Sequence, residues 1–74
     1  MRSPAVERYV AALREWERAH DAHRDAQWAY TDVGHRTEER TRIAAHVARI
    51  ALLTASHALT DADRATLTTD EVML

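Results

Sequence analysis

The sequence predicts an all-α fold, and two features, one of composition and one of patterning, carry that prediction. Glycine and proline each occur once among the 74 residues, which leaves little turn chemistry for a β-sandwich or a mixed fold. Apolar residues return at three- and four-residue intervals along two long stretches, as they do on one face of a helix. We therefore expect residues 1–74 to form a single small domain, an antiparallel helical hairpin followed by a short C-terminal helix.

The first helix is predicted over about residues 4–33. Ser3 can cap its N-terminus, and Pro4 suits the first helical position, where the missing N–H costs no hydrogen bond. The single glycine, Gly34, is expected to end the helix in a left-handed cap. One unbroken helix through Gly34 is the alternative, because an internal glycine costs only about 1 kcal/mol. The packing face of this helix is the row Val6, Tyr9, Leu13, Trp16, His20, His23, Gln27 and Tyr30.

The second helix is predicted over about residues 38–59, with Thr37 as its cap. It is apolar around most of its circumference, and such a helix needs more than one neighbour to cover it. The first helix can cover one side only, so we expect a second copy and a homodimeric four-helix bundle. The predicted oligomer interface consists of Ile43, Val47, Ile50, Leu52, Leu53 and Leu59.

The C-terminal part is predicted to hold one short helix and a final turn. Thr60 followed by Asp63 has the spacing of a capping box, which predicts a helix over Asp61–Leu67. Thr68 or Thr69 can cap a last turn over Asp70–Leu74. The apolar residues at the end of that turn are expected to pack back onto the bundle.

Composition excludes several classes of protein. The sequence has no cysteine, which removes disulfides, zinc–thiolate sites and thiol nucleophiles. A formal net charge of -2 argues against general nucleic-acid binding. No stretch has the length or apolarity of a membrane span or a signal peptide, so we expect no membrane association and a cytoplasmic protein. Ten arginines with no lysine, beside abundant alanine, are typical of a GC-rich bacterial or phage genome.

Histidines on the packing face of the first helix are the most informative polar feature. If the hairpin turns around Gly34, then Glu17, His20, His23 and His46 could approach one another. Imidazole and carboxylate groups suit a divalent metal ion, and no other cofactor is predicted. The favoured interpretation is instead a buried polar layer that fixes register, to which Gln27 also contributes. Such histidines would loosen the assembly between about pH 6.5 and 5 as they gain charge.

No catalytic motif is present in the sequence, so an enzyme is not expected. Trp28 lies off the packing face and is a candidate contact for a protein partner; the alternative is that it covers the hairpin end or the tail over residues 72–74. The predicted function is a protein–protein interaction module, such as an assembly factor, adaptor or small regulator, that acts as a homodimer. The alternatives are a metal-binding bundle and a nucleic-acid-associated regulator that uses Arg36, Arg40, Arg42 and Arg49.

Overall fold

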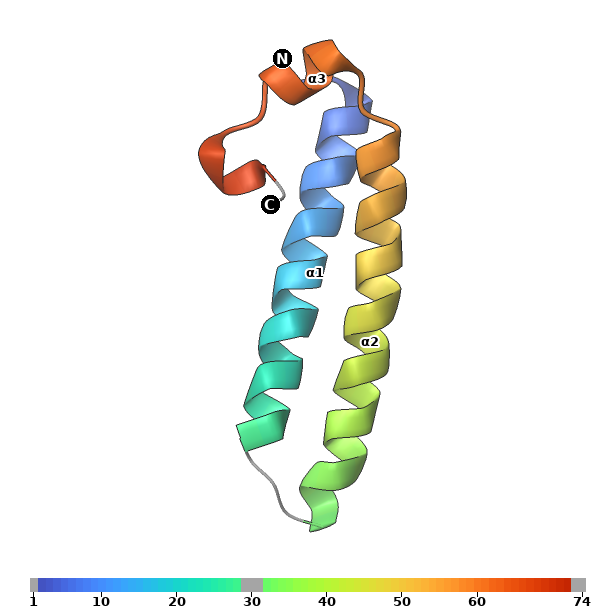
Figure 1. Cartoon of the computed structure of the whole chain (residues 1–74), viewed down its shortest axis with the longest axis vertical. Coiled ribbons are helices and arrows are strands. Elements are labelled where there is room, and N and C mark those ends of the chain that lie inside the picture. The colour runs from blue at the N-terminus through green and yellow to red at the C-terminus, as the bar shows by residue number, and fades with distance from the viewer. Residues whose placement is uncertain (1, 29–31, 73–74) are drawn as a thin grey trace.

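The computed structural model is an antiparallel pair of long helices whose open end is crossed by a short third helix (Figure 1). The structure describes residues 2–28 and 32–72, except for the side chains of residues 32–36. No β-strand occurs in these ranges. The elements are α1 (Pro4–Trp28), α2 (Asp32–His57), α3 (Asp61–Ala65) and the 3₁₀ turn η1 (Thr69–Glu71). The all-helical hairpin expected from the sequence is therefore confirmed.

The start of α1 follows the sequence prediction in detail. Pro4 is the first helical residue, and the Ser3 hydroxyl accepts the backbone N–H of Val6 at 3.2 Å. The Ser3 carbonyl accepts the N–H of Glu7 at 3.0 Å, which is the first helical hydrogen bond. The Ser3 hydroxyl thus satisfies one of the N–H groups that a helix start leaves without helical partners, and the Ser3 carbonyl begins the helical hydrogen bonding.

The turn between the long helices comes earlier in the chain than the sequence predicts. α1 ends at Trp28, and α2 begins at Asp32 instead of near residue 38. Gly34 consequently lies in the first turn of α2, and Thr37 is an interior helical residue, so neither is the predicted cap. An internal glycine costs about 1 kcal/mol, and the additional hydrogen-bonded turn offsets that cost. The residues that join the helices lie outside the described ranges.

Replacing Gly34 with alanine tests this position directly. Because Gly34 is helical, Gly34→Ala is expected to stabilise the fold by up to about 1 kcal/mol, which raises Tm by about 4–8 °C. Thermal unfolding followed by circular dichroism measures the shift. A lower Tm would instead place Gly34 in a left-handed cap, where alanine is strained.

The core is a thin strip between the two long helices. Val6, Tyr9 and Leu13 of α1 are buried against Leu52 of α2 and against Leu59, which lies just after α2. The molecule measures 48 × 19 × 19 Å and has a radius of gyration of 14.7 Å, whereas a compact chain of this length would have a radius near about 11 Å. An elongated hairpin therefore leaves much of each helix at the surface.

The C-terminal part folds back across the open end and down beside α1 (Figure 1). The Thr60 hydroxyl accepts the N–H of Asp63 at 3.1 Å, and the Asp63 carboxylate accepts the N–H of Thr60 at 3.1 Å, which confirms the predicted capping box. α3 ends at Ala65, two residues earlier than predicted, because the Thr66 hydroxyl and N–H both bond the Asp63 carbonyl. Leu67 then packs against the core.

Candidate interaction surface

The side of α2 that faces away from α1 carries a row of exposed apolar side chains. Ile43, Val47 and Ile50 are 52%, 60% and 52% exposed, respectively. Leu52 is buried, and two residues along a helix point about 160° apart, so Ile50 lies almost opposite the core. We call the row Ile43, Val47, Ile50 and Thr54 the outer face of α2; all four are exposed.

The six predicted interface residues fall into two groups. Ile43, Val47, Ile50 and Leu53 are at the surface of the single chain, whereas Leu52 and Leu59 are buried in its own core. The sequence pattern showed that α2 is apolar nearly all round, but it did not show which of its sides meets α1. The structure assigns Leu52 and Leu59 to the contact with α1 and leaves the opposite side open.

The exposed side of α1 is different in chemistry. It carries charged residues that pair along the helix, with Arg14 and Glu17 at 3.2 Å, Arg18 and Glu15 at 3.0 Å, and Arg24 and Asp21 at 3.3 Å. Such a face is well suited to water. The hairpin therefore has one polar outer side, on α1, and one apolar outer side, on α2.

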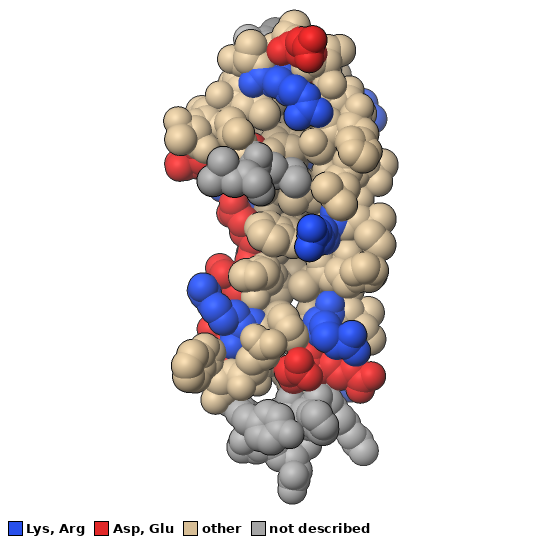
Figure 2. All heavy atoms as spheres, viewed as in Figure 1, with Lys and Arg blue, Asp and Glu red and all other residues tan. Residues whose placement is uncertain are grey.

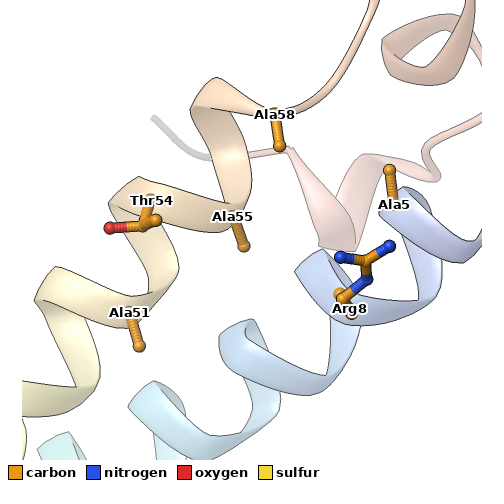
Figure 3. Close-up of a pocket in the computed structure, with 6 residues that line it drawn as sticks. All are labelled: Ala5, Arg8, Ala51, Thr54, Ala55 and Ala58. Atoms are coloured by element: carbon orange, nitrogen blue, oxygen red, sulfur yellow. The ribbon is translucent and has the colours of Figure 1, made fainter.

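A shallow groove between the two helices adjoins the outer face of α2 (Figure 3). It encloses about 550 Å³, and Thr54 belongs both to the groove and to the outer face. Small side chains leave this space, since four of the six lining residues are alanines. The lining residues are Ala5 and Arg8 of α1, Ala51, Thr54 and Ala55 of α2, and Ala58, which directly follows α2. The groove extends the apolar surface of α2 toward α1.

A second groove, of about 410 Å³, lies between the helices and the C-terminal segment. Leu13, Trp16 and Leu52 form its apolar floor, and Val72 lies at its edge. Val72 thus returns to the hairpin, as predicted, although it stays half exposed. The other lining residues are Glu17, Arg49 and Asp70.

The predicted metal ligands are not brought together in the described part of the chain. The earlier turn shifts the register by five residues, so His23 lies beside Thr41 (Nδ1 to Oγ1, 3.2 Å) where His46 was expected. Glu38 is the nearest carboxylate to His23, at 4.0 Å from Nε2. Glu17 pairs with Arg14, and no group of three His, Asp or Glu side chains in the described residues could hold a metal ion.

In the single chain, three of the four residues of the predicted polar layer are not buried. Among the described histidines, only His23 is largely covered between the helices. His20 stacks on Trp16 with ring centroids 5.1 Å apart, yet it remains exposed, as do Gln27 and His46. The predicted loosening at mildly acidic pH stays a prediction.

Trp28 is 86% exposed at the end of α1. Its predicted place off the packing face is confirmed, and its predicted contact with a protein partner stays a prediction. The alternative role, a cover for Val72, is wrong, because Val72 lies beside Leu13 and Trp16 farther toward the start of α1.

One polar cluster was not anticipated from the sequence. The Arg2 guanidinium donates to both carboxylate oxygens of Glu71, at 2.6 and 2.7 Å, and the Glu71 side chain is almost fully buried. The N–H of Thr68 donates to the same carboxylate at 2.9 Å, and the Tyr9 hydroxyl donates to the Glu71 carbonyl. We call this cluster, Arg2, Tyr9, Thr68 and Glu71, the terminal clasp. Nearby, the Ser3 hydroxyl donates to Asp63 at 2.9 Å.

The terminal clasp makes stability depend on pH. The Arg2 guanidinium, helped by the Thr68 N–H, lowers the pKa of Glu71 from 4.5 to about 2. A carboxyl group with a depressed pKa stabilises the fold fully above its unfolded pKa, and that contribution is lost as pH falls from 4.5 toward about 2. We expect Glu71→Gln to lower Tm at pH 7, with the difference from the wild type shrinking across this window.

Thermal unfolding of both chains at pH 7, 4 and 2.5 measures this effect. Glu15→Gln is the matched control, because Glu15 forms an exposed pair with Arg18 that contributes little. A difference between wild type and Glu71→Gln that stayed constant down to pH 2.5 would contradict the role of the buried ion pair.

Comparisons with known proteins give no further guide to the site. No family model, no curated protein and no solved structure matches the chain. In the described residues, no helix is both long enough and apolar enough to cross a membrane. On the face shown in Figure 2, acidic and basic side chains of the described residues are dispersed and form no extended patch of one sign.

Proposed function

We propose that this chain is a protein–protein interaction module that acts as a homodimeric four-helix bundle, in the manner of an assembly factor, adaptor or small regulator. The observation that carries the proposal is the outer face of α2, where Ile43, Val47 and Ile50 are each more than half exposed. Three large aliphatic side chains at successive helical turns form a contiguous apolar strip. Such strips mark interaction sites, whereas single exposed apolar residues are common on any surface.

The exposed surface area of the single chain is larger than expected for a monomer, which supports the proposal that a partner covers part of it. The chain exposes 5751 Å², whereas a folded monomer of 8.4 kDa exposes about 4,600 Å². The excess, about 1,100 Å², is comparable with the roughly 800 Å² that each partner buries in a stable dimer. A thin core of few large side chains also needs support, since chains of this size rarely gain more than about 3–5 kcal/mol from a single core.

A second copy is the simplest partner for this surface. The outer face of α2 is uncharged, and the chain has a formal net charge of -2, so two copies repel each other only weakly. The polar side of α1 would remain in water, and two α2 helices would form the centre of the bundle. The exposed Trp28, at the far end of α1, would stay available to a further protein partner.

Native mass spectrometry of the untagged protein, over about 1–200 μM, tests the proposal. The expected result is a dimer whose share rises with concentration, without bound metal. A strictly monomeric mass over the whole range would overturn it. Stoichiometric metal that survives dialysis would favour the metal-binding alternative, and salt-sensitive DNA binding would favour the arginine-based one.

A further inference from the structure

The outer face of α2 is flanked by an acid at one end and an imidazole at the other. Glu39 and His57 are eighteen residues apart, which is five complete helical turns, so they lie in line along α2. Between them, Ile43, His46 and Ile50 lie within about 40° of that line, and Val47 lies about 80° from it. Glu39 and His57 are both exposed, and neither side chain forms an ion pair or hydrogen bond with any residue in the part of the chain that the structure describes.

We propose that two copies pair antiparallel through this face, with the twofold axis between Val47 and Ile50. This inference rests on the proposed function, and it specifies the geometry of the assembly. With the axis at that point, residues whose numbers sum to about 97 face each other. Val47 then meets Ile50 of the second copy, and Ile43 meets Thr54 of the second copy. Apolar side chains are matched along the middle of the contact.

Complementarity between the two ends of α2 selects this orientation. The twofold axis is perpendicular to the helices, so a given flank of α2 meets the same flank of its partner. Glu39 therefore lies beside His57 of the second copy, where the carboxylate can accept an imidazole N–H, and the pair occurs twice. A parallel pairing would instead place the two Glu39 carboxylates against each other, and like charges that face each other disfavour an interface.

The absence of cysteine from the sequence makes the orientation measurable by disulfide cross-linking. A disulfide needs Cα atoms within about 7 Å. Residues 43 and 54 are eleven apart, or about 16 Å along the helix axis. In the antiparallel dimer, a mixture of Ile43→Cys and Thr54→Cys chains is expected to form the mixed disulfide. Each variant alone is expected to cross-link at least about tenfold more slowly than the mixture.

The outcomes separate this inference from the proposed function. Fast cross-linking of Ile43→Cys with itself, in a protein that is dimeric by mass, would overturn the antiparallel geometry and leave the homodimer intact. A dimer in which neither the mixture nor the single variants cross-link would show that another face forms the contact. A protein that is monomeric at all concentrations would overturn the proposed function itself.

A charge exchange gives a second, independent readout. Glu39→Arg is expected to weaken dimerisation about three- to tenfold, because it removes the carboxylate that accepts the His57 N–H of the second copy at both ends of the contact. His57→Glu should weaken it similarly, and the double variant should restore most of the loss. Additive losses in the double variant would contradict the pairing of Glu39 with His57 of the second copy.

Discussion

Replacing Ile50 with aspartate is expected to raise the dimer dissociation constant about 100-fold or more and to leave a folded monomer. Ile50 lies at the middle of the outer face of α2, so the twofold contact would bury two carboxylates without partners. Leaving a buried charge unpaired costs about 3–5 kcal/mol, and every 1.4 kcal/mol is about tenfold in affinity. Sedimentation velocity over the concentration range in which the wild type dimerises measures the change.

A matched control makes the result specific to this surface. Ala11 is exposed on the polar side of α1, so Ala11→Asp places the same charge in a helix of similar length without touching the proposed contact. This variant is expected to dimerise like the wild type. Both variants should keep their helical circular dichroism, since Ile50 contributes nothing to the core of the single chain. Persistent dimerisation of Ile50→Asp would show that α2 is not central.

Replacing Leu52 with alanine is expected to abolish most of the stability of the fold. Leu52 is 2% exposed and packs against α1 in a core that holds few large side chains. Truncation of a buried leucine costs about 2–5 kcal/mol. A chain of this size gains little more than that from its whole core, so we expect largely unfolded protein at 37 °C. Urea or thermal unfolding by circular dichroism measures the loss.

The neighbouring leucine provides the comparison. Leu53 is 37% exposed and lies outside the buried cluster, so Leu53→Ala is expected to cost well under half as much as Leu52→Ala. Equal losses at the two positions would indicate that α2 is rotated relative to α1 from the arrangement described above. The pair therefore tests the orientation of α2 with the same substitution at adjacent residues.

Local sequence signals predicted the parts of the fold that depend on local physics. Ser3, Pro4 and Thr60 each act within three residues of their own position, and the helix starts that they predict are confirmed. The apolar periodicity around Val6 and Leu13 predicted the packing face of α1 for the same reason. Hydrogen bonds between a residue and its third or fourth neighbour can be read from spacing alone.

The position of the turn could not be obtained in this way. Gly34 was expected in the turn because glycine favours left-handed backbone, but one glycine is too small a penalty to end a helix by itself. The error of five residues then moved His46 away from His23 and brought Thr41 to it. Every predicted contact between the two helices was displaced by the same five residues, including those of the predicted metal site. Contacts between helices depend on where the chain reverses, which no local pattern specified.

The pairing of Arg2 with Glu71 was equally out of reach, because the two residues are 69 positions apart. Surface charges of either sign are common, and composition alone gives no reason to join these two. The only local signal was Thr68, one of two predicted caps for the last turn, whose N–H donates to the Glu71 carboxylate.

The terminal clasp also has a consequence for the order in which contacts form during folding and open during unfolding. The α1–α2 contacts close first, since helices form and pair within microseconds, whereas a contact across 69 positions closes nearly the entire chain and pays the largest loop entropy. The clasp should therefore be the last contact to form during folding and the first to open. Amide hydrogens around Leu67 and Glu71 would exchange ahead of those in α1, and proteases would enter the molecule from its C-terminal segment while the hairpin is still intact.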